Sequence, residues 1–194
     1  MLSTDTYNII EIKSLFISAL FHDAGHKWVA EDLDEFRSLD MAFQGIIDFE
    51  EKYNYSGIDY SIVRKSIIGT VFKNRAKNKD KYAILLADLD VSTIGMSFPE
   101  FLYYADFPIS IEFWVDIKKW VKDVNYFKFL TGVDKNIFRE ETLRNIFPEY
   151  LRNIKKYLSI EANFIEKLYN YWNSDDITYE KFEKFYEKNL PLFA

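Results

Sequence analysis

The sequence predicts an all-α protein, a helical bundle with a C-terminal helical extension. Apolar residues recur at intervals of three and four along most of the chain, which is the spacing of one face of a helix. Glycine and proline are scarce, at 6 and 4 of 194 residues, as expected for helices joined by short turns. Hydrophobic residues make up 48% of the chain, which is enough to bury a core.

The first helix is predicted from about Thr6 to Phe21. Its apolar stripe comprises Ile9, Ile12, Phe16, Ala19 and Leu20. We expect this stripe to be the inner face of an amphipathic helix. The helix delivers His22 and Asp23 at its end, and Gly25 then allows the chain to change direction.

The second and third helices follow in the next 50 residues. Asp32 or Asp34 is expected to cap the second helix, whose apolar residues are Phe36, Leu39, Met41, Phe43, Ile46, Ile47 and Phe49. After a turn over residues 54–57, a third helix is predicted from Asp59 to about Lys73. The basic stretch from Lys73 to Lys81 lacks interleaved aromatic residues, so we expect a solvated turn rather than a nucleic-acid contact.

The segment from Tyr82 to Leu89 is apolar nearly all round and fits either a buried strand or a buried helix. Its helical neighbours favour a central helix, which should be the most buried segment of the chain and lie beside the end of the first helix. Asp88 and Asp90 close this segment, and a buried carboxylate is costly unless it is paired or binds a metal. Two alternatives stay open: Asp88 pairs with an arginine, or Asp90 caps the helix end.

The second half of the chain reads as further helices. Ser97 and Glu100 form a capping box. The helices that follow are predicted at about 110–130, at 137–158 with an interruption near Pro148, at 161–172 and at 178–190. We expect residues 1–155 to form the main domain and 156–194 an extension packed on the same core. The extension should pack through Phe164, Leu168, Tyr171, Phe182 and Phe185.

Charge and composition exclude several classes of function. The net charge of −6 argues against a nucleic-acid-binding surface, which is normally basic. The chain has no cysteine, and therefore neither disulfides nor thiolate zinc sites. It has no signal peptide and no apolar run of about 18 residues. We therefore expect a soluble cytoplasmic protein without nucleic-acid or membrane partners.

Both histidines of the chain lie in the segment Phe21-His22-Asp23-Ala24-Gly25-His26. A carboxylate beside an imidazole at a helix end can bind a divalent cation such as Mn, Fe, Co, Ni, Zn or Mg. The alternative is that His22 and His26 are ordinary hydrogen-bonded histidines beside a capping Asp23.

Three segments, taken in order, resemble the HD superfamily of metal-dependent phosphohydrolases. Residues 21–26 resemble its His-Asp signature at a helix end, residues 34–42 its Asn-Glu-x-x-Ser segment with Asp34 at the Asn position, and residues 88–95 its Asp-Ala-Asp-Leu segment. The likeness is to the branch of small predicted HD phosphohydrolases and covers about residues 9–155. The second histidine, His26, also resembles that of cyclic-nucleotide phosphodiesterases.

The resemblance implies an HD-domain helical bundle that hydrolyses a small-molecule phosphoester, a nucleotide or cyclic nucleotide, with a divalent metal ion. The implied metal ligands are His22, Asp23 and one of Asp90 and Asp88, with Asp90 preferred. Glu35 and His26 would be catalytic, as general acid, second-metal ligand or proton donor. The alternatives are a solvent-exposed Glu35 and a His26 that only hydrogen-bonds a loop carbonyl. The implied phosphate-binding residues are Lys27, Arg37, Arg139 and Arg144, with solvated arginines as the alternative.

The sequence also departs from the family. The first metal ligand of the family is a histidine on an upstream helix, and no histidine precedes His22. The segment Thr70-Val71-Phe72 lacks the histidine of the branch's Thr-x-His feature. Three interpretations of the missing histidines stay open: the true start codon lies further upstream, the metal site has fewer ligands, or the site is inactive. The alternative function is therefore a catalytically impaired HD-fold protein that binds a nucleotide or a protein partner. A helical interaction protein with accidental motifs is the third hypothesis.

Overall fold

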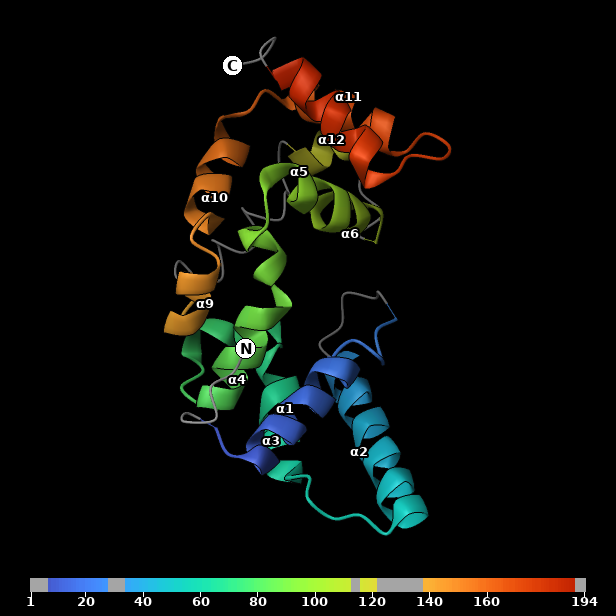
Figure 1. The fold of residues 1–194 in the computed structure, drawn as a ribbon, viewed down its shortest axis with the longest axis vertical. Coiled ribbons are helices and arrows are strands. Elements are labelled where there is room, and N and C mark those ends of the chain that lie inside the picture. The colour runs from blue at the N-terminus through green and yellow to red at the C-terminus, as the bar shows by residue number, and fades with distance from the viewer. Residues whose placement is uncertain (1–6, 28–33, 113–115, 122–137, 191–194) are drawn as a thin grey trace. The chain divides into compact units, whose positions relative to one another are not determined.

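The structure is a computed structural model that describes residues 7–27, 34–112, 116–121 and 138–190. These residues form helices and turns without a strand, so the all-α class is confirmed. Figure 1 shows the elements in chain order. They are α1 (Ile9–Phe21), α2 (Asp34–Tyr53), α3 (Tyr60–Gly69), η1 (Phe72–Lys77), α4 (Lys81–Asp90), η2 (Ser92–Gly95), α5 (Phe98–Phe101), η3 (Leu102–Asp106), α6 (Phe107–Glu112), α7 (Ile117–Lys119), α9 (Glu141–Ile146), α10 (Tyr150–Ser159), α11 (Ala162–Trp172) and α12 (Tyr179–Asn189).

The chain divides into two compact units, residues 1–90 (unit 1) and residues 91–194 (unit 2). Unit 1 contains α1 to α4, and unit 2 contains η2 and all later helices. Residues 156–194 thus share a unit with residues 91–155. The division expected at residue 155 stays a prediction. No helix in the described part of the chain combines the length and hydropathy needed to cross a membrane.

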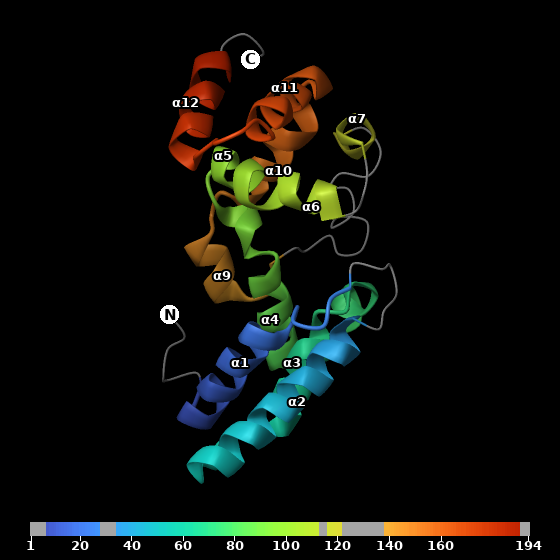
Figure 2. The ribbon, with the colours of Figure 1, turned by 90° about the vertical axis from the view of Figure 1, so that its right-hand side faces the viewer.

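Helices α1 to α4 of unit 1 form a bundle (Figure 2). One apolar cluster of buried residues lies between them. The buried members come from α2, α3 and α4, and they are Leu39, Ala42, Ile46, Val63, Ile67 and Leu86. Ile17 and Phe21 of α1 pack against this cluster with partly buried side chains. The sequence thus positions the end of α1 against the core of unit 1.

The buried face of α1 differs from the face that the apolar spacing predicted. Ile9, Phe16 and Leu20 are exposed, whereas Ser14, Leu15 and Ser18 are buried. Hydrogen bonds satisfy both buried serines: Ser14 Oγ donates to Ile10 O at 2.7 Å and accepts from Asp59 N at 2.8 Å, and Ser18 Oγ donates to Ser14 O at 2.7 Å. Small side chains let α1 approach the start of α3 closely, and this approach sets the rotation of the helix.

Helices α1 and α4 run in parallel, with side-chain contacts at both ends. At the start, the carboxylate of Glu11 accepts hydrogen bonds from Lys81 Nζ, at 2.7 Å, and from the Tyr82 hydroxyl. Asn8 caps α1 in a capping box with the same Glu11. At the other end, His22 follows α1 and Asp90 is the last residue of α4. Two helices of similar length joined at their starts bring these ends together.

Helix α4 is central to unit 1, which confirms the helical interpretation of the apolar segment. Ala83, Leu85, Leu86 and Ala87 are buried, whereas Leu89 is exposed. The crossing of α3 over α4 is close, because a Cβ on Gly69 would lie 2.5 Å from the Cβ of Ala83. A glycine at this position therefore permits the packing that holds α4 in place.

The basic stretch after α3 is not entirely a solvated turn. Residues 72–77 form the 3-10 helix η1, and within it the side chain of Arg75 is buried. Lys73, Lys77 and Lys79 are exposed, as expected. Arg75 differs from these lysines because it reaches the carboxylate of Asp88, so an ion pair replaces solvent.

Unit 2 has an aromatic core. Its largest fully buried side chains are Trp120, Phe101, Phe107, Phe138, Phe164 and Phe182. The carboxylate of Asp106, fully buried among them, accepts hydrogen bonds from Trp120 Nε1 at 3.0 Å and from the Tyr157 hydroxyl at 2.9 Å. The predicted capping box of Ser97 and Glu100 is confirmed.

The predicted helices of unit 2 are confirmed in part. The helix is interrupted near Pro148, as expected, because α9 ends at Ile146 and α10 begins at Tyr150. The helix expected at 110–130 is interrupted, because α6 ends at Glu112 and Asp116 caps α7. Residues 113–115 and 122–130 lie outside the described residues. In α11 and α12, Phe164, Leu168 and Phe182 are buried, and Tyr171 stacks on Phe185 with ring centroids 3.9 Å apart.

Candidate metal centre

His22, the first residue after α1, has an imidazole held in one orientation by the helix itself. Its Nδ1 lies 2.8 Å from the carbonyl oxygen of Ala19. A carbonyl oxygen only accepts hydrogen bonds, so Nδ1 carries a proton and donates it. The other ring nitrogen, Nε2, therefore faces away from the helix backbone and toward two carboxylates.

These carboxylates belong to Asp23 and Asp90. His22 Nε2 lies 3.1 Å from Asp23 Oδ2 and 3.4 Å from Asp90 Oδ1. One ligand atom from each of the three residues lies within 4.8 Å of the other two. The side chains are 21%, 51% and 26% exposed for His22, Asp23 and Asp90, so the cluster is open to solvent on one side.

A positive charge between its atoms would stabilise the two carboxylates of this cluster. If Nδ1 holds the only ring proton, the Nε2 lone pair of His22 faces two negatively charged oxygens, which is unfavourable. A proton on Nε2 relieves the repulsion. Burial lowers the pKa of His22, but hydrogen bonds to Asp23 and Asp90 outweigh it and raise that pKa to about 10. Burial raises the pKa of Asp23, and its contact with His22 more than offsets this, so the pKa of Asp23 is lowered.

A divalent cation is the other way to supply that charge. Ligand atoms about 2.0–2.2 Å from an ion, at angles between about 90° and 110°, are separated by about 2.8–3.6 Å. The observed separations of 3.1 and 3.4 Å match this spacing. A histidine that donates its second ring N–H to a backbone carbonyl is also the usual arrangement of a metal-binding imidazole. The donor set of one imidazole and two carboxylates suits Mn²⁺, Fe²⁺, Co²⁺ or Zn²⁺.

The loop after His22 is tied to the start of α2. Gly25 N donates to Ser38 Oγ at 2.9 Å, and Arg37 Nε donates to Gly25 O at 3.1 Å. Lys27 N lies 3.4 Å from Asp34 Oδ1, which also accepts from the guanidinium of Arg37. Residues 34–38 therefore position the loop that carries Asp23 and His26.

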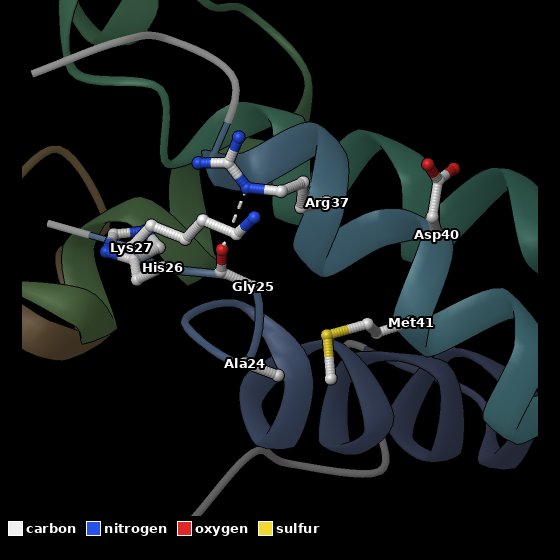
Figure 3. A pocket seen from close by; sticks show the side chains of 7 residues that line it. All are labelled: Ala24, Gly25, His26, Lys27, Arg37, Asp40 and Met41. Atoms are coloured by element: carbon white, nitrogen blue, oxygen red, sulfur yellow. Dashed lines mark hydrogen bonds between the residues drawn. The ribbon is translucent and has the colours of Figure 1, made fainter. Parts of the chain in front are cut away.

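A pocket of about 370 Å³ opens beside this loop (Figure 3). It is lined by Ala24, Gly25, His26, Lys27, Arg37, Asp40 and Met41. His26 joins the pocket to the cluster, because its Nε2 lies 3.3 Å from Asp23 Oδ1. Figure 3 shows the side chains of Lys27 and Arg37 on one side of Gly25, and Met41 and Ala24 on the other.

The structure brings together three of the four residues considered as metal ligands. Asp88, the fourth, is buried and pairs with Arg75 at 2.8 Å, which is the alternative that the sequence left open. Glu35 is half-buried on α2 and is not part of the described cluster. Arg139 and Arg144 belong to unit 2, where Arg144 donates to the carbonyl oxygens of Phe138 and Arg139. Their role in phosphate binding stays a prediction.

Sequence reasoning missed three contributors to this site. The carbonyl of Ala19 left no signal, because any residue at that position supplies the same acceptor. Ser38 lies in a segment that resembled the family, yet spacing alone did not connect it to Gly25. Arg75 was assigned to a solvated stretch, although a buried Asp88 already called for a cationic partner.

No family model, curated protein or solved structure matches this chain.

Proposed function

We propose that the protein is a metal-dependent phosphohydrolase of the HD type, which hydrolyses a small phosphoester such as a nucleotide or cyclic nucleotide. The observation that carries this proposal is the orientation of His22. Its Nδ1 is occupied by Ala19 O, and its Nε2 meets one oxygen each of Asp23 and Asp90 at the spacing of a coordination sphere.

The number of ligands supports a catalytic rather than a purely structural metal. Three protein ligands leave positions free for water and substrate, as in catalytic zinc sites, whereas structural sites are usually closed by four. The partly exposed Asp23 leaves one side of the cluster accessible. The order of the HD-like segments supports the same assignment, because two of them supply His22, Asp23 and Asp90.

A bound divalent ion would lower the pKa of a water molecule so that hydroxide is available near neutral pH. The remaining functions fall to residues of the pocket. His26 contacts Asp23 and lines the pocket, so it is placed to give a proton to the leaving oxygen. Lys27 supplies an exposed ammonium to the same pocket, which suits a phosphate oxygen. The charge of Arg37 is largely compensated by Asp34, so we assign it a lesser part in substrate binding.

The test combines metal binding with hydrolysis. Purified protein is stripped with EDTA and titrated with Mn²⁺ by calorimetry, and then assayed with bis-p-nitrophenyl phosphate, p-nitrophenyl phosphate and 3′,5′-cyclic AMP. We expect binding of one Mn²⁺ and Mn²⁺-dependent hydrolysis of at least one ester. His22→Ala, Asp23→Asn and Asp90→Asn should each weaken Mn²⁺ binding at least tenfold and abolish hydrolysis.

Asp48→Asn is the matched control, because Asp48 is an exposed carboxylate of α2 that is bonded to Gln44 and lies outside the cluster. It should bind Mn²⁺ like the wild type. The proposal is wrong if the wild type binds none of Mn²⁺, Fe²⁺, Co²⁺, Ni²⁺, Zn²⁺ and Mg²⁺. It is equally wrong if hydrolysis persists in Asp23→Asn in the presence of EDTA.

A second candidate function is binding of a metal–nucleotide complex without hydrolysis. Within the described residues, the cluster contains a single histidine and does not include Glu35. Glu35, the carboxylate considered as general acid or second-metal ligand, lies outside this cluster, so the site would retain a metal–nucleotide complex without that group to complete hydrolysis. Mn²⁺-dependent binding of a nucleotide, measured by calorimetry together with absent hydrolysis of all three esters, would identify this function.

A further inference from the structure

Both backbone polar groups of Gly25 bond to two consecutive side chains of α2. The N–H donates to Ser38 Oγ at 2.9 Å, and the carbonyl accepts from Arg37 Nε at 3.1 Å, the dashed contact of Figure 3. Ser38 is fully buried, and Gly25 is buried as well. A buried backbone group without a partner is costly, so these two bonds are strongly favoured.

The approach of Gly25 to α2 leaves no room for a side chain. A Cβ on Gly25 would lie 2.4 Å from Ser38 N and 2.6 Å from Arg37 Cβ. The loop backbone therefore lies directly against the backbone of α2. The short side chain of Ser38 places its hydroxyl beside the Gly25 N–H at this separation. The longer side chain of Arg37 folds back so that Nε reaches the Gly25 carbonyl oxygen.

Much of the loop around Gly25 is exposed to solvent. Asp23, Ala24 and Lys27 are exposed, so apolar packing does not determine where the Asp23 carboxylate points. Backbone turns join Ala24 N to Phe21 O and His26 N to Asp23 O, but these bonds stay within the loop and α1. Side chains of residues 34, 37 and 38 link the loop to α2.

We propose that Ser38 and Arg37 are positioning residues, which hold Gly25 so that the Asp23 carboxylate faces both His22 and His26. The inference concerns the metal-free protein and rests on the proposed function only where metal affinity is the readout. It assigns the segment Asp34–Ser38 a role in building the site, separate from the lesser part in substrate binding proposed for Arg37, and it places neither Ser38 nor Arg37 on the metal.

The experiment compares Ser38→Ala and Arg37→Met with the matched control Ser66→Ala. Ser66 is a fully buried serine of α3 in unit 1, and its hydroxyl has no hydrogen-bond partner in the described part of the chain. Like Ser38→Ala, this control removes a buried serine hydroxyl from unit 1, but it leaves the hydrogen bonds of Gly25 intact. Arg37 is partly exposed, so its replacement keeps the test available if Ser38→Ala fails to fold.

The first readout needs no metal. The chain contains two histidines, so a long-range ¹H–¹⁵N spectrum of the imidazoles, recorded in EDTA, reports on His22 and His26 alone. We expect the ring signals of His26, and to a lesser extent those of His22, to shift in Ser38→Ala and Arg37→Met and to stay unchanged in Ser66→Ala. Unchanged ring signals in both loop variants would overturn the positioning role.

The second readout is Mn²⁺ affinity, which a purely structural role would leave unchanged in a folded variant. Loss of outer contacts that orient metal ligands typically weakens binding about 10- to 100-fold. We expect a loss of this size in Ser38→Ala and at most a twofold change in Ser66→Ala. Wild-type affinity in both loop variants would contradict the inference. If the wild type itself binds no metal, the proposed function fails, and the imidazole spectra alone decide the positioning role.

Discussion

The guanidinium of Arg75 lies 2.8 Å from the carboxylate of Asp88, and the two side chains are 3% and 0% exposed. Arg75 also donates to the carbonyl of Ala87, so it holds the last turn of α4 from one side. Residues two positions apart on a helix point about 200° apart around its axis. With Asp88 turned inward to Arg75, Asp90 is turned to the opposite side, where it meets His22.

Removing Arg75 should strongly destabilise unit 1. Arg75→Met removes the cation that pairs with the buried Asp88 carboxylate, and breaking a buried ion pair in this way costs about 3–5 kcal/mol. Lys65→Met is the control, because Lys65 pairs with Asp80 at 3.2 Å on the surface, where the loss should be under about 1 kcal/mol. Urea unfolding of both variants measures the difference, and equal losses would contradict the buried pairing.

Adding a methyl group to Gly25 should also destabilise the protein. The new Cβ meets backbone atoms of α2 at 2.4 Å, so the loop must shift, and overpacking of this kind costs about 1–3 kcal/mol. At Gly45, within α2, the new Cβ meets only the tip of the Phe21 ring at 3.0 Å. The higher helix propensity of alanine offsets that contact by about 1 kcal/mol. Thermal unfolding should place Gly25→Ala well below Gly45→Ala, and the reverse order would refute the close approach.

The buried carboxyl of Asp106 should make the stability of unit 2 fall as pH rises. Burial raises its pKa to about 7, against hydrogen bonds from Trp120 and Tyr157 that lower it. Between its ordinary pKa of 3.8 and about 7, the folded state holds a proton that the unfolded state has lost. The free energy of unfolding therefore decreases with pH across this window, by at most about 4 kcal/mol.

The measurement is the difference in unfolding free energy between the wild type and Asp106→Asn, taken from pH 4.5 to pH 8. The amide has no charge to lose, so the wild type should become less stable relative to the variant as pH rises. A difference that is independent of pH would show that the Asp106 carboxyl titrates normally.

Glu11 should have the opposite pH dependence in unit 1. Hydrogen bonds from Lys81, from Tyr82 and from the backbone of Asn8 lower its pKa from 4.5 to about 2. A depressed pKa contributes stability that is complete above 4.5 and is lost as pH falls through about 2. Glu11→Gln should therefore be less stable than the wild type at pH 6, and the two should converge toward pH 2. Urea midpoints across that range provide the test, and a gap that stays constant would count against the Glu11 network.

Much of the fold follows from local features of the sequence. The all-α class, the helical break at Pro148 and the capping box of Ser97 with Glu100 all depend on neighbours within a few residues. The position of His22 and Asp23 at a helix end is local in the same sense, because the apolar run that precedes them ends there. For these features the sequence by itself was sufficient.

The tertiary structure decided which sides of the helices meet. Apolar spacing assigned Phe16 and Leu20 to the inner face of α1. In the structure these two side chains are exposed, and Ser14, which accepts a hydrogen bond from Asp59 N, is on the buried face instead. The choice between Asp88 and Asp90 depended on where Arg75 approached α4 from η1. The hydrogen bonds of Gly25 with Arg37 and Ser38 join residues that are 12 and 13 positions apart in the sequence. Such contacts depend on the rotation and separation of packed helices, which no periodicity within one segment specifies.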